Sequence, residues 1–234
     1  MTTSRTTLLI ADIGGYTEYM GSHRMTLAHA EVNTARMLDS VIDAARGFDL
    51  VEIEGDAAFL SRRAGDRDAG AVLAEVLQAA AQMHRAFHRE REYVVANLCP
   101  CGGCRQARAL TLKFVAHVGD VAIQSIRGRS KLVGIDVILA HRLLKNDVTI
   151  PEYVLITDDL YSGVAGSRPE GVQELTQEVE GIGQVLTHIV DVGELDQGSD
   201  PGRPTLATRL SSTFSAIGRG LPYMIGARGM RVQR

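Results

Sequence analysis

The chain has 234 residues, of which 45% are hydrophobic and 23% are charged, as expected for one globular domain with additions. This composition excludes a wholly disordered chain, and the longest run without a charged residue, the twelve residues from Tyr93 to Cys104, is too short for a transmembrane helix. The first residues lack the features of a secretory signal, so we expect a cytoplasmic protein whose cysteines are reduced thiols or metal ligands.

The formal net charge of −3 is unevenly distributed. Residues 201–234 contain six arginines and no acid, so removing this +6 from −3 leaves −9 on residues 1–200. We therefore predict a main domain over 1–200 and a basic, irregular extension over 201–234. The acidic body disfavours nucleic acid as a partner. We expect the extension to pack over the acidic domain or to contact an anionic partner, such as the periphery of a membrane, with a solvated tail as the alternative.

Hydrophobic periodicity and turn residues predict alternating strands and helices. In chain order, the predicted strands cover 6–11, 49–54, 57–61, 110–118, 121–126, 153–157, 172–179 and 184–192. The predicted long helices cover 24–46, 67–92 and 134–145. Tight turns are expected at Gly55-Asp56 and Gly119-Asp120.

This order predicts an α+β fold with a ferredoxin-like βαββαβ core and extra strands and helices. Such cores place helices on one face of an antiparallel sheet, so we expect the other face to remain open for a partner. A cysteine-rich insert, at about 93–108, interrupts the predicted domain.

Two aspartates stand where predicted strands end. Asp12 follows the first strand, and Asp56 lies in the hairpin turn. A carboxylate pair without nearby His or Cys suits Mg²⁺ or Mn²⁺, and the backbone N–H groups of Gly14 and Gly15 would face an anion such as phosphate. The alternative is that both aspartates only begin turns, where Asp is common.

Four segments in order resemble motifs of the class III adenylate/guanylate cyclases, over about residues 6–192. They are Ile10-Ala-Asp-Ile-Gly-Gly-Tyr-Thr17, Glu52-Ile-Glu-Gly-Asp-Ala57, Lys113-Phe-Val-Ala-His-Val-Gly119 and Gly134-Ile-Asp-Val-Ile-Leu-Ala-His-Arg-Leu143. The resemblance implies the cyclase catalytic fold, a nucleoside triphosphate substrate, Mg²⁺ or Mn²⁺, and a homodimer with sites between its two chains.

The resemblance also implies roles for individual residues. Asp12, Asp56 and the Ile13 carbonyl would be metal ligands, and Arg142 would be the catalytic residue that stabilises charge on the reacting phosphate. The residues implied to bind nucleotide are Gly14, Gly15, Tyr16, Thr17, Glu52 and Lys131.

Two departures from the family pattern weaken the reactive half of the implied site. Ile138 stands where the family has an Asn that orients the ribose, and isoleucine has no group for that task. Glu180 lies in the turn where a Lys or Arg would hold the terminal phosphates, which a carboxylate repels. Glu52 and Lys131 also form neither familiar base-reading pair, so ATP and GTP remain alternatives.

The segment Cys99-Pro-Cys-Gly-Gly-Cys104 brings three potential zinc ligands together. Zinc usually takes four ligands, so the fourth would come from elsewhere in the chain or from a second subunit, and His88 and His84 on the preceding helix are the nearest candidates. The alternatives are reduced thiols in a loop or a labile disulfide. His117 is interpreted as structural, on a strand face that points to the cleft or to the dimer interface.

Three functions fit the sequence. The first is a metal-dependent cyclase that relies on Asp12, Asp56 and Arg142. The second is a degenerate cyclase-like module that binds a nucleotide and signals as a dimer. The third is an interaction or sensor protein in which the cysteine insert binds Zn²⁺ or reports redox state.

Overall fold

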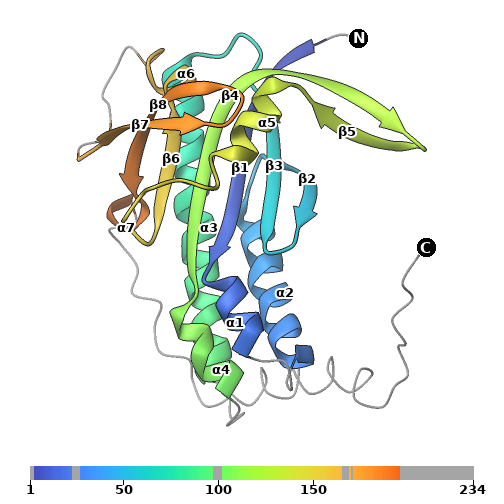
Figure 1. Cartoon of the computed structure of the whole chain (residues 1–234), viewed down its shortest axis with the longest axis vertical. Helices are drawn as coiled ribbons and strands as arrows, with labels where there is room; N and C mark the ends of the chain where they lie inside the picture. The colour runs from blue at the N-terminus through green and yellow to red at the C-terminus, as the bar shows by residue number, and fades with distance from the viewer. Residues whose placement is uncertain (1–2, 23–26, 97–101, 165–168, 170, 196–234) are drawn as a thin grey trace.

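The computed structural model describes residues 3–22, 27–96, 102–164, 169 and 171–195. Within them an eight-stranded sheet has the order β2-β3-β1-β4-β6-β8-β7, and β5 pairs with β4 alone (Figure 1). The strands are β1 (Thr3–Gly14), β2 (Asp49–Glu54), β3 (Ala57–Arg63), β4 (Thr111–Ile126), β5 (Arg129–Val133), β6 (Tyr153–Thr157), β7 (Gln173–Val179) and β8 (Gly183–Asp191). The predicted α+β class is confirmed.

Two long helices, α2 and α3, cover one face of this sheet, and shorter helices complete the fold (Figure 1). The helices are α1 (Tyr16–Ser22), α2 (Leu27–Ala44), α3 (Ala69–Ala96), α4 (Gly102–Gln106), α5 (Ile135–Arg142), α6 (Asp158–Tyr161) and α7 (Val192–Leu195), with a 3₁₀ turn η1 (Ala107–Ala109). A helix is present at each of the three predicted positions, and α3 runs four residues further than its predicted end at Glu92. The helix predicted over 134–145 is shorter than expected, since α5 has only eight residues.

Side chains of β1 alternate between the two faces of the sheet, as the pleat of a strand requires. Leu9, Ala11 and Ile13 are buried in the core that includes α2 and α3. Leu8 and Ile10 are buried in a second core formed with α5. The expectation of an open second face is therefore wrong where α5 packs, because the apolar β1 residues on that face need a cover of their own.

The predicted turn at Gly119-Asp120 is also wrong. β4 is one strand of 16 residues that stays paired with β1 through this point, with Gly119 opposite Thr6 and Asp120 opposite Arg5. The reversal comes later, at Arg127 and Gly128, which both have positive φ. Gly119 is needed for space, since a Cβ there would lie 2.3 Å from Asp136 Cγ.

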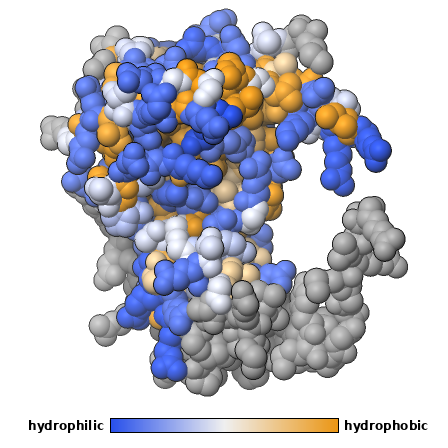
Figure 2. Space-filling view, in the orientation of Figure 1, coloured by the Kyte–Doolittle hydropathy of each residue, from blue (hydrophilic) through white to orange (hydrophobic). Residues whose placement is uncertain are grey.

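The end of β4 and its partner β5 project from the body as a hairpin (Figure 1). This hairpin carries two exposed isoleucines, Ile123 and Ile126, which are 63% and 53% exposed. Figure 2 shows apolar surface on this arm beside strongly hydrophilic side chains. Exposed apolar residues on a projecting strand are typical of an interaction surface.

None of the helices in the described part of the chain combines the length and the apolar character needed to cross a bilayer. The basic extension predicted over 201–234 lies outside the described residues.

Candidate functional site

The structure brings together the two aspartates at the ends of β1 and of the β2–β3 hairpin. β1 and β3 are antiparallel neighbours with Asp12 opposite Ala57, the residue that follows Asp56. The Ile13 N–H donates to the Asp56 carbonyl oxygen at 3.3 Å, which fixes the turn against the strand. Both side chains are partly exposed, so the two carboxylates lie at one solvent-accessible edge.

Charge crowding marks this edge. Burial, followed by the nearby negative charge of Asp12, raises the pKa of the Asp56 carboxyl above its ordinary value. Lys113 lies on β4 directly opposite Asp12, and its Nζ is 3.2 Å from Asp12 Oδ2. This one cation partly balances two acids, and a bound divalent cation would balance them further.

The glycines after Asp12 serve close packing and a turn. A Cβ at Gly14 would lie 2.3 Å from Thr111 Oγ1, and Gly15 has a φ of +80°. The chain then enters α1 at Tyr16, followed by exposed Thr17. Burial, with smaller contributions from the charges of Asp56 and Glu31, raises the pKa of Tyr16, so this phenol stands close to the aspartate pair.

The residues implied to read the base and stabilise the reaction form a separate group. Glu52, Lys131, Ile138 and Arg142 all line one open pocket of about 450 Å³ between β2, β5 and α5. Ile138 is 47% exposed in this pocket. Asp12 and Asp56 are not among the lining residues. One chain therefore presents the carboxylate pair and the pocket as two distinct half-sites.

Arg142 lies against the turn that joins β7 to β8. Its Nη1 would be 3.0 Å from a Cβ added to Gly181, which has a φ of +70°. Glu180 precedes this glycine and is exposed. This turn near Arg142 therefore carries an acid, Glu180, at the position where the family resemblance implies a Lys or Arg.

A buried polar network holds α5 on the sheet. The His117 side chain is 1% exposed, with Nδ1 2.7 Å from Thr157 Oγ1 and Nε2 3.1 Å from Asp136 Oδ1. Asp136 Oδ2 accepts the Asp120 N–H at 2.8 Å. The expectation that His117 faces the cleft or the interface is wrong, because α5 covers it, whereas the interpretation of His117 as structural agrees with these contacts.

The cysteine segment is only partly described. Cys99 and Cys101 lie outside the described residues, and Cys104 is buried, with Asn33 Nδ2 3.7 Å from its Sγ. His84 and His88 gather with Glu152, in a group that contains no described cysteine. Among the described residues the two histidines pair with a carboxylate, and a pairing of either histidine with Cys99 or Cys101 lies outside the described residues.

Comparison with known proteins gives a family. Residues 34–153 match the family described as "Protein of unknown function (DUF2652)". The uncharacterized protein Rv2561/Rv2562 of Mycobacterium tuberculosis is 37% identical over 193 residues, which cover 82% of this chain and 89% of that protein. The chain belongs to the DUF2652 family.

Solved structures place this DUF2652 chain in the fold of class III cyclase domains. The guanylate cyclase domain of RhGC from Catenaria anguillulae, solved with GTP, has a TM-score of 0.58 at 18% identity and covers 81% of this chain and 98% of its own. The guanylyl cyclase Cya2 has a TM-score of 0.59 at 17% identity, over 82% and 95%. A class III adenylyl cyclase-like ATP-binding protein from Pseudomonas aeruginosa has a TM-score of 0.57 at 17% identity, over 69% of this chain and 35% of its own.

Three contacts in this family member were missed by reasoning from the sequence. Lys113 was identified only as the first residue of a motif, because its ion pair with Asp12 depends on the register of β1 and β4. His141 pairs with Glu54 at 3.2 Å, across two elements far apart in the chain. Glu152 had no signal, since an acid between a proline and a strand is common. Only tertiary structure shows what these side chains face.

Proposed function

We propose that this chain is a divergent class III cyclase-like protein that binds a nucleoside triphosphate with Mg²⁺ or Mn²⁺ between two copies of itself, and that any cyclisation it performs is slow. The observation that carries this proposal is the meeting of Asp12 and Asp56 at the end of β1. The cyclase fold supports it independently.

The donor set at this edge fits a hard divalent cation. Asp12 and Asp56 offer carboxylate oxygens and Ile13 offers its carbonyl, with no described His or Cys ligand gathered with them. A bound ion would neutralise the triphosphate and activate the ribose hydroxyl. The raised pKa of Asp56 fits this assignment, because two carboxylates that repel each other gain most from a cation.

The pocket between β2, β5 and α5 would hold the rest of the nucleotide. Glu52 accepts hydrogen bonds and Lys131 donates them, so together they present both kinds of partner to the edge of a purine. Arg142 supplies a permanent positive charge at the same pocket. Its five N–H donors suit phosphate oxygens.

A dimer would unite the two half-sites. Asp12 and Asp56 do not line the pocket of their own chain, so a two-fold arrangement would bring the carboxylates of one chain to the pocket of the other and form two equal sites. Exposed apolar residues on β2, the projecting hairpin and α5 support this second copy as the partner. They are Leu50, Ile53, Ile123, Ile126, Ile135 and Ile138.

Ile138 favours binding over fast catalysis. Isoleucine cannot orient a ribose oxygen, and the loss of one such group typically costs about 100-fold or more in rate. The cyclase-like protein from Pseudomonas aeruginosa is itself named for ATP binding. A binding module without turnover is therefore the second candidate function.

A zinc ion on Cys99, Cys101 and Cys104 belongs to the third hypothesis, a sensor or interaction role. The burial of Cys104 is the structural observation that bears on it, since a buried thiolate site would be shielded from solvent. Zinc analysis of the wild-type chain and of its triple Cys→Ser variant measures this contribution.

Mn²⁺-dependent binding of ATP and GTP, measured by equilibrium dialysis, tests the proposal. We expect Asp56→Ala to weaken binding about 100-fold or more, because the cation then loses a charged ligand. Asp66→Ala is the matched control, since it removes one exposed acid from another turn. Equal nucleotide binding by wild type and Asp56→Ala would overturn the assignment of the site.

A product assay separates the two candidate functions. Cyclic nucleotide formed with Mn²⁺ and lost in Asp56→Ala would identify a slow cyclase, whereas tight binding without product would identify a binding module. Ile138→Asn is expected to raise turnover about tenfold or more in the first case, because it restores a group that acts in the transition state.

A further inference from the structure

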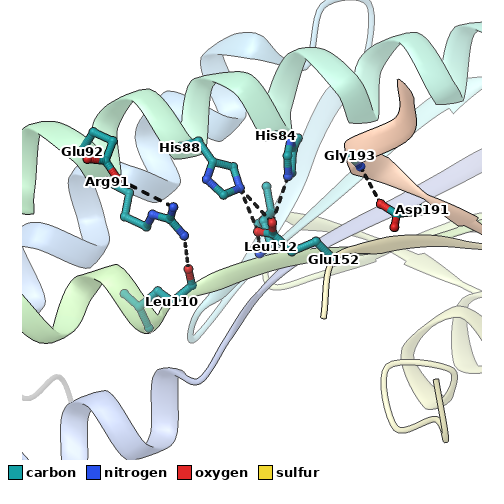
Figure 3. Close-up of polar contacts among 9 residues, drawn as sticks. All are labelled: His84, His88, Arg91, Glu92, Leu110, Leu112, Glu152, Asp191 and Gly193. Carbon is teal, nitrogen blue, oxygen red and sulfur yellow. Dashed lines mark hydrogen bonds and ion pairs between the residues drawn. The ribbon is translucent and has the colours of Figure 1, made fainter. Parts of the chain in front are cut away.

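A second cluster of potential metal ligands shares no residue with the lining of the pocket between β2, β5 and α5. His84 and His88 come from α3, and Glu152 comes from the residue just before β6 (Figure 3). Their ligand atoms all lie within 4.8 Å of one another. Among the described residues, this is the group in which three such side chains meet.

Helix geometry aligns the two histidines. Residues four apart share one face of a helix, which is how paired histidines bind zinc in helical metal motifs. The rings of His84 and His88 have centroids 4.2 Å apart. Figure 3 shows both rings pointing from α3 toward the Glu152 carboxylate.

Glu152 completes the cluster from the opposite side. Its Oε2 is 3.2 Å from His84 Nε2, and its Oε1 is 2.9 Å from His88 Nε2. The Leu112 N–H donates to the same Oε1 at 2.9 Å, which fixes the orientation of the carboxylate. Arg91 fastens the same face of α3 to the chain before β4, by donating to the Leu110 carbonyl at 2.8 Å.

We propose that His84, His88 and Glu152 bind one divalent transition-metal ion, with Zn²⁺ as the best fit. Two imidazoles and one carboxylate are an established zinc ligand set, and the imidazoles disfavour Mg²⁺ and Ca²⁺. Ligand atoms around a tetrahedral zinc ion lie about 3.3 Å apart. The two carboxylate–imidazole separations of 2.9 and 3.2 Å are already close to this value, and all the ligand atoms lie within 4.8 Å of one another. The rings therefore need to shift by about 1.5 Å at most to surround an ion.

Burial and access both suit such an ion. The side chains of His84, His88 and Glu152 are 9%, 19% and 19% exposed, so the ligands are shielded without being sealed. His84 and His88 also border an open cavity of about 780 Å³, whose lining does not include Glu152, so solvent reaches the cluster from the side of the histidines. This site is separate from the Asp12–Asp56 edge, and the inference does not depend on nucleotide binding.

The ion would join three parts of the fold. α3 supplies both histidines, Glu152 leads into β6, and the carboxylate is bonded to the backbone of β4 at Leu112. Leu112 is paired with Ile13, and the next pair along the strands is Lys113 with Asp12. The metal would thus stabilise the strand end that carries the aspartates.

Co²⁺ titration of the metal-free, full-length protein, followed by visible spectroscopy, tests this site. We expect one ion with the absorption bands of nitrogen and oxygen ligation. His88→Gln should weaken its binding at least about 100-fold, since a direct ligand is lost. His141→Gln is the matched control, because it removes a histidine that pairs with Glu54 outside the cluster. A thiolate-to-cobalt charge-transfer band would show a second ion bound to the cysteines, which is then counted separately from the ion at this site.

Glu152→Gln is a second variant, which tests whether a loss of metal binding results from misfolding or from the loss of a ligand. This variant keeps oxygen and nitrogen atoms for the neighbouring histidines but removes the charge that the ion needs. Zn²⁺ should raise the melting temperature of the wild-type chain and leave that of a folded Glu152→Gln variant unchanged. The proposal is overturned if the wild type binds no Co²⁺, or if His88→Gln and Glu152→Gln bind it as the wild type does.

Discussion

At the scale of single residues, the Asp12–Asp56 edge is defined by an imbalance of charge. Two carboxylates share one lysine, Lys113, which contacts Asp12 at 3.2 Å. Desolvation and the Asp12 charge raise the pKa of Asp56, and Lys113 only partly opposes them. A site in this state binds protons and cations more readily than an isolated aspartate does.

Asp12→Asn should therefore lower the pKa of the Asp56 carboxyl toward its ordinary value. The substitution removes the repelling charge but leaves burial, the larger cause, so the return is incomplete. An NMR titration of the carboxyl carbons in the metal-free protein, assigned with Asp56→Asn, measures the change. Asp66→Asn, which alters a distant exposed acid, should leave the Asp56 titration in place.

The raised pKa also has a defined sign for stability. The folded chain keeps the Asp56 proton to a higher pH than the unfolded chain. The stability contributed by this group therefore falls as pH rises from about 3.8, the ordinary pKa of an aspartate, through the raised pKa of the folded chain. An Asp56 pKa that is unchanged or raised in Asp12→Asn would contradict this account of the edge.

The sequence was informative about these residues only where local pattern was enough. Asp12 and Asp56 were located because each follows a recognisable strand, and their meeting needs only that β1 and β3 are neighbours. Glu152 could not be located, because its histidine partners lie 68 and 64 residues away. Such contacts depend on how α3 lies over the sheet, which periodicity does not encode.

At the scale of elements, α5 is held on β4 by Asp136, whose position requires that residue 119 is a glycine. Asp136 near the start of α5 bonds to His117 and to the Asp120 N–H, and it occupies the space where a Cβ of Gly119 would be. These contacts set the position of Ile138 and Arg142, two and six residues further along α5.

Gly119→Ala should destabilise the fold by about 1–3 kcal/mol, because the new methyl group would displace a side chain that is fixed by two bonds. Urea unfolding measures the loss. Gly21→Ala is the control, since nothing lies within 4 Å of its Cβ position and alanine favours a helix. Equal stability of Gly119→Ala and wild type would mean that Asp136 is not held as the contacts indicate.

The element scale also explains which sequence predictions failed. Hydrophobic alternation located β4, but a Gly-Asp pair within it resembles a turn, and only the pairing with β1 shows that the strand continues. The long helices α2 and α3 were predicted well because their apolar stripes are long, whereas the short α1 and α4 were not predicted and α5 is shorter than expected. The face of the sheet that α5 covers was not predicted. An eight-residue helix with buried Val137, Leu139 and Ala140 does not indicate on which side of the sheet it packs.

At the scale of the whole molecule, the two half-sites and the exposed apolar surface point to the same arrangement. Asp12 and Asp56 are absent from the lining of the pocket, and the hairpin projects from the body that the described residues form (Figure 1). A second copy of the chain would bring its carboxylates to the pocket and would cover the hairpin, since a two-fold partner presents the same surfaces in return.

The hairpin gives the sharpest test of this dimer. Ile123→Ser with Ile126→Ser removes two side chains that are 63% and 53% exposed in the single chain. Their burial against a partner would contribute roughly 1.4 kcal/mol or more, so the double variant should weaken dimerisation about tenfold or more. Sedimentation equilibrium across a range of concentrations measures the association.

Leu186→Ser is the control for this change, because it removes a 38% exposed apolar residue from β8, away from the hairpin. It should dimerise as the wild type does, and circular dichroism should show all three proteins folded. Nucleotide binding should fall together with dimerisation in the double variant, since each site needs both chains. A wild type that stays monomeric at tens of micromolar, with and without nucleotide, or a double variant that dimerises unchanged, would exclude the hairpin as the contact between two copies.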